Sequence, residues 1–148
     1  MNDALSCYIA SSWFNPIANK EVDDIKQALT DAGYDLFSPR DHLICPADAG
    51  GDFQKFVFDG NIEHLRKCDF MVANSHGKDM GTIFEAGYFS CLGKPIIYFC
   101  AGLNGQFNLM LSQSGIKVCT SIQDLRDYLQ RCRQAGVLLT EEYTGLIE

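Results

Sequence analysis

The sequence predicts an α/β fold: a single doubly wound, five-stranded parallel sheet with helices on both faces. Five short apolar segments alternate with segments whose apolar residues recur every three or four positions. Strands that alternate with helices form right-handed crossovers, and these build a parallel sheet buried on both sides. A chain of 148 residues can form a full hydrophobic core. We therefore expect one domain over residues 1–148, with a flavodoxin-like strand order.

The first half of the chain predicts two strands and one helix. Residues 7–14, "CYIASSWF", are a short apolar run that enters serine, which predicts a strand with a loop at its carboxyl end. In residues 19–33 the apolar positions define one helix face, and a glycine ends the pattern. Residues 34–39 predict a second strand that a proline stops. Residues 40–52 contain proline and glycine and are long enough to be a functional loop.

The second half repeats this alternation. A helical spacing that Gly60 weakens comes first, Gly93 ends the next helix, and Ser121 is a good N-cap residue for the last one. The expected helices are residues 53–68, 82–93, 107–115 and 121–136, and the expected strands are residues 69–74, 94–100 and 116–119. We expect the acidic tail "EEYTGLIE" to be a frayed surface terminus.

Charge and apolar runs restrict the partners. The formal net charge is −7 and no basic stretch is longer than two residues, which argues against broad binding to nucleic acids or anionic membranes. No stretch approaches the roughly 18–20 apolar residues that a bilayer-spanning helix needs. The first residues lack the basic and apolar regions of a signal peptide. We therefore expect a cytoplasmic protein without membrane contact.

Known cofactor and metal motifs are missing from the sequence. It contains no GxGxxG, GxxxxGK[ST] or GxSxG pattern, and its three histidines have no metal-ligand spacing. The seven cysteines form no CxxC pair and lie mostly in apolar segments, which favours reduced, buried thiols. We therefore expect neither a cofactor nor a bound metal.

Polar and aromatic side chains collect where the predicted strands end, and ligands bind at this edge of doubly wound sheets. The residues concerned are Ser11, Ser12, Trp13, Phe14, Asn15, Arg40, Asp41, His42, Asn74, Ser75, His76, Asp79, Glu85, Asn104, Gln106 and Asn108. Aromatic rings together with amides suit a flat polar heterocycle such as a nucleobase. The scarcity of arginine and lysine argues against a polyphosphate.

Glu85 has two interpretations from position alone. In a helix that starts near Thr82 it would occupy the first turn, where the helix dipole favours a carboxylate by roughly 0.3–1 kcal/mol. Its apolar neighbours instead suggest a carboxylate kept for chemistry, because desolvating it is costly. His64 is expected to be an exposed helical residue, whereas His42 and His76 lie in edge loops where they could touch a ligand.

Several motifs together carry a resemblance to a known family. The stretch "DMGTIFEAGY" followed by "GKPII" resembles the DxGTxxExG(Y/F)…GKP signature of the nucleoside 2-deoxyribosyltransferase family. "YIASSWFNPIANK", "FDGNIEHLRKCDFMVAN" and "FNLM" are similar to other segments of that family, in the same order. The resemblance covers most of the chain.

The resemblance implies a set of catalytic residues. Glu85 would be the nucleophile, and Tyr8 would hydrogen-bond to it and orient it. Asp79 would hold the 5′-hydroxyl of the sugar together with Asn108 from an adjoining subunit.

It also implies substrate-binding residues. Trp13 and Phe14 would flank the base, Gly81 of the signature would line the site, and Met110 of a neighbouring subunit would pack near the sugar. Some family members carry aspartate where this chain has Asn61, and that aspartate is assigned to sugar binding or proton transfer. Asn61 forms hydrogen bonds but is not an acid, so the group that protonates the leaving base stays open, with Asp79 or an ordered water as the candidates.

The implied reaction is transfer of a 2-deoxyribosyl group from a deoxyribonucleoside to a free nucleobase, through a covalent ester on Glu85 with net retention. A homo-oligomer would close the site against water. A related hydrolase that cleaves deoxynucleoside 5′-monophosphates is the first alternative, for which Ser11, Ser12 and Ser75 would contact the phosphate. A non-catalytic nucleotide-binding or signalling module is the second, and there Glu85 would only be a helix-start residue.

Overall fold

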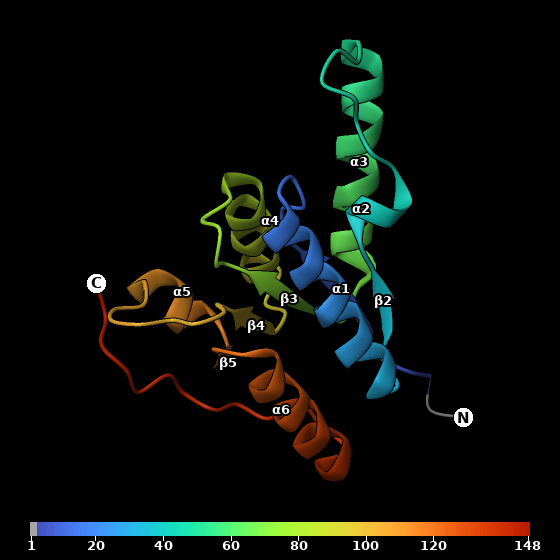
Figure 1. The fold of residues 1–148 in the computed structure, drawn as a ribbon. Coiled ribbons are helices and arrows are strands. Elements are labelled where there is room, and N and C mark those ends of the chain that lie inside the picture. The colour runs from blue at the N-terminus through green and yellow to red at the C-terminus, as the bar shows by residue number, and fades with distance from the viewer. Residues whose placement is uncertain (1–2) are drawn as a thin grey trace.

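A computed structural model of the chain, described here for residues 3–148, has a five-stranded sheet in the order β2-β1-β3-β4-β5 (Figure 1). The strands are β1 (Ser6–Ala10), β2 (Asp35–Phe37), β3 (Phe70–Asn74), β4 (Ile96–Phe99) and β5 (Lys117–Cys119). Every neighbouring pair is parallel. The predicted fold class and strand order are confirmed. The order reverses between β1 and β3, which is where ligands bind in such sheets.

The helices follow the predicted alternation, with one additional helix and with starts that differ from the expected ones by one to three residues. They are α1 (Pro16–Asp31), α2 (Pro39–His42), α3 (Gly51–Lys67), α4 (Met80–Cys91), α5 (Leu109–Ser114) and α6 (Ile122–Ala135). The short α2 lies at the start of the expected loop 40–52, because Pro39 takes the first helical position, where its missing N–H costs nothing. Helix α4 begins two residues before Thr82, since Asp79 caps it.

Side chains alternate between two hydrophobic cores on the two faces of the sheet. From β1, Cys7 and Ile9 point into the core covered by α1 and α6. Tyr8 and Ala10 point into the opposite core, together with Ala86 of α4. This opposite face therefore brings the middle of β1 against the helix that carries Glu85.

Helix α3 packs through only one end. Leu65, near its carboxyl end, is its one buried residue, whereas Phe53, Phe56 and Phe58 are exposed. In Figure 1 the first half of α3 extends away from the rest of the domain. Exposed aromatic residues on a projecting helix are typical of a surface that contacts another chain.

The carboxyl-terminal tail is not frayed, so this expectation was wrong. The Phe107 N–H donates to the Leu146 carbonyl at 2.9 Å, and the Glu148 N–H donates to the Phe107 carbonyl at 3.0 Å. A parallel bridge joins Phe107 and Ile147. These backbone bonds hold the tail along the segment before α5.

Within residues 3–148, no helix combines the length and the apolar character that crossing a bilayer requires.

Candidate active site

The candidate site lies at the carboxyl ends of β1 and β3, where the sheet order reverses. Its centre is the loop of residues 75–79 and the first turns of α4, which follow β3 directly. Every group described below comes from this loop, from α4, or from elements that flank it in space.

Asp79 is fixed as the N-cap of α4. Its Oδ2 accepts hydrogen bonds from the Thr82 N–H at 2.8 Å and the Thr82 Oγ1 hydroxyl at 2.9 Å. A side-chain carbon at Gly81 would lie 3.3 Å from the same Oδ2, so the glycine leaves the room that the carboxylate occupies. Oδ1 makes no hydrogen bond within residues 3–148 and is available to a ligand.

Glu85 lies deeper in α4 than the sequence suggested. Because the helix starts at Met80, Glu85 is beyond its first turn, so the dipole at the helix start does not explain this carboxylate. In the described part of the chain, Glu85 Oε2 and the Tyr8 hydroxyl are buried polar side-chain atoms without a hydrogen-bond partner. Buried polar groups are normally satisfied, and an orphaned pair suggests a place where a ligand completes the bonds.

Glu85 and Tyr8 nevertheless shift each other's pKa. Burial raises the pKa of Glu85 to about 7; the adjacent Tyr8 hydroxyl lowers it somewhat as a hydrogen-bond donor, and the charge of Asp79 raises it. Burial, and then the Glu85 charge, hold the pKa of Tyr8 well above its ordinary value. The Tyr8 hydroxyl is therefore close to Glu85 and protonated, although the two form no hydrogen bond of regular geometry in this structure. A carboxylate with a pKa near neutrality is a common sign of catalytic use.

A polar network supports the loop that leads to Asp79. The Asn74 side-chain amide donates to Ser11 Oγ at 3.1 Å and to Glu21 Oε2 at 2.8 Å. The other Glu21 oxygen meets His76 Nδ1 at 2.5 Å. Lys78, immediately before Asp79, has a positive φ of 51°, an uncommon backbone conformation for a residue other than glycine. The network thus ties α1 to a tight turn that aims Asp79.

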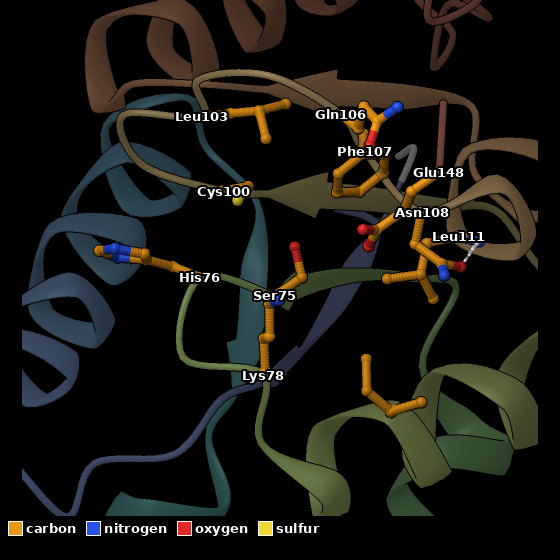
Figure 2. A pocket seen from close by; sticks show the side chains of 11 residues that line it. Ser75, His76, Lys78, Cys100, Leu103, Gln106, Phe107, Asn108, Leu111 and Glu148 are labelled. Carbon is orange, nitrogen blue, oxygen red and sulfur yellow. Dashed lines mark hydrogen bonds between the residues drawn. The ribbon is translucent and has the colours of Figure 1, made fainter. Parts of the chain in front are cut away.

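Beside this loop lies a cavity of about 310 Å³ (Figure 2). The loop of residues 75–78 forms one wall, and the segment before α5 forms the other with Phe107 and Asn108, while Glu148 comes from the tail. Asn108 Oδ1 accepts from the Met110 N–H at 3.0 Å and the Leu111 N–H at 3.2 Å, so the oxygen caps α5 and the side-chain NH₂ remains available. Met110 itself is 73% exposed.

Trp13 and Phe14 lie together in the loop after β1. Their ring centroids are 5.0 Å apart, Trp13 is half-buried, and Phe14 is 77% exposed. Asn61 is half-buried on α3. These residues surround the carboxyl edge from β1 and α3. Neither they nor Glu85 line the cavity of about 310 Å³.

The cysteines are unpaired throughout residues 3–148. All seven cysteines are free thiols, and Cys7, Cys68, Cys119 and Cys132 are buried, as the apolar segments predicted. No group of three or more His, Cys, Asp or Glu side chains lies in a metal-binding arrangement within residues 3–148.

The profile of the family described as nucleoside 2-deoxyribosyltransferase matches residues 7–120, a stretch that includes β2 through β5, all of β1 except Ser6, and both Asp79 and Glu85. The chain belongs to this family. The resemblance read from the signature motif is therefore confirmed.

Solved structures with the same fold are similar to this chain. A 2-deoxyribosyltransferase from Bacillus psychrosaccharolyticus is similar with a TM-score of 0.77 and 29% identity, over 93% of this chain and 98% of that chain. A conserved protein from Enterococcus faecalis V583 has a TM-score of 0.71 at 19% identity, over 87% and 99% of the two chains. A CMP N-glycosidase from Clostridium botulinum has a TM-score of 0.54 at 18% identity, over 87% and 98%, and shares the fold. The sequence has no match among functionally curated proteins.

Sequence reasoning missed two features of this deoxyribosyltransferase-family site. Glu21 was predicted only as part of a helix. It lies in α1 a few residues after the loop that follows β1, and this position places it at the ligand edge. His64 was expected to be exposed, which was wrong: it is half-buried and stacks on Phe37, with ring centroids 3.7 Å apart and an interplanar angle of 9°. Only the packing of α3 against the end of β2 reveals this contact.

Proposed function

We propose that this protein transfers a 2-deoxyribosyl group between nucleobases, with Glu85 as the nucleophile, in cytoplasmic nucleoside salvage. Membership of the deoxyribosyltransferase family supports the reaction class. The observation that carries the assignment is Glu85, whose Oε2 is buried without a hydrogen-bond partner within residues 3–148 and whose pKa is raised to about 7. A non-catalytic module would have no need of such a group, and a carboxylate at the helix start is excluded as its explanation by the position of Glu85 in α4.

In the proposed first step, a Glu85 oxygen attacks C1′ of the deoxyribose as the bond from C1′ to the base nitrogen breaks. The electron pair of that bond passes to the base, which takes up a proton, and an ester joins C1′ to Glu85. The negative carboxylate stabilises the positive charge that develops at C1′ in the transition state. In the second step a new base attacks C1′ from the face that the first base left, and Glu85 is released. Two inversions give net retention.

The groups around Glu85 have matching roles in this proposal. The Tyr8 hydroxyl would donate a hydrogen bond to the Glu85 oxygen that does not attack, which orients the carboxylate. Oδ1 of Asp79 would accept the 5′-hydroxyl of the sugar, because Oδ2 is already used to cap α4. Trp13 and Phe14 would cover the faces of the base.

The hydrolase of 5′-monophosphates remains the second candidate function, since serines are present at the same edge. Two of these serines already donate their hydroxyl protons to the backbone: Ser11 to the Ser12 carbonyl at 2.7 Å, and Ser75 to the Phe99 carbonyl at 3.2 Å. A phosphate would therefore find few free hydroxyl donors there, and it would face the Asp79 carboxylate. Both features favour a substrate with a free 5′-hydroxyl.

A homo-oligomer is part of the proposal. Large apolar side chains are exposed around the site, namely Phe14, Phe56, Met80, Phe84 and Met110. We propose that Asn108 and Met110 of one subunit complete the site of another, because a transferase has to keep water from the glycosyl ester.

Two substrates and one variant test the activity. The protein is incubated with deoxyinosine or thymidine, with and without adenine, and the products are separated. Formation of deoxyadenosine, together with a deoxyribosyl mass adduct that is absent from Glu85→Ala, is the expected result. Free base released without exchange, and only from 5′-monophosphates, would establish the hydrolase instead. No turnover of either class would refute both.

Complementation tests the shared site. Glu85→Ala and Asn108→Ala proteins are each assayed alone, and then after they are mixed under conditions that exchange subunits. If Asn108 acts in a neighbouring site, mixed oligomers contain sites with both residues intact, and activity returns. If it acts within its own chain, mixing restores nothing.

A further inference from the structure

Two histidines form an aromatic cluster with Phe37 at the carboxyl end of β2. The Phe37 and His64 rings are stacked in parallel, with centroids 3.7 Å apart. The His42 ring lies 5.1 Å from Phe37 and 5.0 Å from His64. The three residues come from β2, α2 and α3, so only the fold brings them together.

This cluster is in contact with the centre of the site. Phe37 pairs with Tyr8 in the register of β1 and β2, and their ring centroids are 5.4 Å apart. Tyr8 in turn lies close to Glu85; burial, and then the Glu85 charge, raises the pKa of Tyr8. On α3, His64 is three residues after Asn61, so the two share one helix face. The two histidines therefore lie on the β2 side of Tyr8, at the carboxyl edge of the sheet. In the proposed function, the base would bind at this edge.

The hydrogen bond of His64 fixes which of its nitrogens is free. His64 Nδ1 lies 2.8 Å from the Gly60 carbonyl oxygen. A carbonyl oxygen only accepts, so Nδ1 carries a hydrogen. Nε2 makes no hydrogen bond within residues 3–148 and can exchange a proton with a ligand.

We propose that His64 donates the proton that the departing nucleobase needs, and that Phe37 and His42 hold its ring for this step. The proposal rests on the proposed transferase function. As the bond from C1′ to the base breaks, its electron pair moves into the base, and a base ring nitrogen takes the proton from Nε2 of the His64 imidazolium. This leaves a neutral imidazole whose hydrogen is on Nδ1, bonded to the Gly60 carbonyl. When the second base attacks C1′, it returns a proton to Nε2. His64 thus supplies the acid that Asn61 cannot.

Charged groups near the two histidines are mostly neutralised by partners. Asp41, next to His42, pairs with Lys26 at 2.5 Å and with Arg40 at 3.0 Å. Glu63, next to His64, pairs with Lys67 at 2.5 Å. From β1, the Tyr8 ring packs against Phe37. Imidazole donates and accepts protons near neutral pH, as a step of this kind requires.

The test compares two leaving groups. Deoxyinosine needs protonation of its base, whereas the purine of 7-methyl-2′-deoxyguanosine already carries a positive charge. Deoxyribosyl transfer from each to adenine is measured for the wild type, His64→Ala and His64→Asn. The asparagine can still donate to the Gly60 carbonyl and so preserves the local structure. Lys55→Ala, an exposed substitution on the same helix, is the matched control.

We expect both His64 variants to lose about 10²-fold or more with deoxyinosine and to lose little with 7-methyl-2′-deoxyguanosine. Equal losses with both substrates would mean that His64 is only structural, and no loss with either would mean that another group is the acid. Both results overturn the inference and leave the proposed function intact. A wild-type protein inactive with both nucleosides would instead refute the proposed function itself.

Discussion

Asp79 and Thr82 form a double hydrogen bond that fixes the start of the helix carrying Glu85. Both the N–H and the hydroxyl of Thr82 donate to Asp79 Oδ2, at 2.8 and 2.9 Å. One carboxylate oxygen thus caps the helix, and the other makes no hydrogen bond within residues 3–148. The same contact sets the helix register, and with it the position of Glu85 six residues after Asp79.

Thr82→Val should weaken substrate binding. Thr82 is buried, and valine keeps its shape but removes the hydroxyl that holds Asp79. We expect KM for the deoxyribonucleoside to rise about tenfold and the free energy of unfolding to fall by about 1 kcal/mol. Thr82→Ser keeps the hydroxyl and should stay close to wild type. Steady-state kinetics and urea unfolding check both variants, and equal effects of valine and serine would contradict this role.

Gly81→Ala should lower activity through Asp79. The added methyl group would lie 3.3 Å from Asp79 Oδ2 and push the carboxylate away from its position. We expect kcat/KM to fall about 10–100-fold, because a misplaced binding group disturbs the geometry of the reacting substrate. The control is Gly51→Ala at the start of α3, where the new methyl group meets nothing within 4 Å. If both alanine variants retain full activity, the close contact at Gly81 has no functional role.

Glu85→Gln should stabilise the protein at high pH. The folded-state pKa of Glu85, about 7, is above the ordinary value of 4.5, so the folded state binds more protons between these two values. Stability is therefore lost as pH rises from about 4.5 to 7. Glutamine removes this penalty, and we expect a gain of about 2 kcal/mol at pH 8, or about 4–8 °C in Tm. At pH 4 the difference should vanish. Thermal unfolding at both pH values measures it, and a constant difference would contradict the assignment.

The rate should depend on ionisation of Glu85. A nucleophilic carboxylate has to be charged, so kcat/KM should fall about tenfold per unit below a midpoint near 7. Because the Tyr8 hydroxyl lowers the pKa of Glu85, Tyr8→Phe should move this midpoint upward. A pH–rate profile of the two proteins provides the measurement. A wild-type midpoint near 4.5 would show that Glu85 titrates as an ordinary surface carboxylate.

Removing residues 144–148 should loosen the segment that presents Asn108. The tail accepts from and donates to Phe107, and the Leu109 N–H donates to the Glu148 carbonyl at 3.3 Å. Without these bonds, amide hydrogen exchange at residues 107–111 should become faster by at least tenfold, and KM should rise. Exchange in α6 is the internal control. Unchanged protection at residues 107–111 would show that the tail pairing is dispensable.

The fold was largely predictable because its signals are local. Helical spacing, a glycine stop and short apolar runs depend on neighbours within a few residues, so the alternation, the parallel sheet and its strand order followed from the sequence. The start of α4 was predicted two residues too late, because the sequence does not show which side chain accepts hydrogen bonds from the first N–H groups of the helix. The prediction of a frayed tail was wrong because the hydrogen bonds of the tail join residues that are about 40 positions apart.

The sequence by itself determined the family, the doubly wound sheet, and Asp79 and Glu85 as the residues to examine, since these are carried by periodicity and by a contiguous motif. Only the tertiary structure decided that Glu85 Oε2 is buried beside the Tyr8 hydroxyl, and that His64 stacks on Phe37 rather than facing solvent. The physical reason is that burial and ring stacking depend on which faces of α3, α4 and β1 meet. Contacts between segments distant in the chain set those faces, and no local pattern records them.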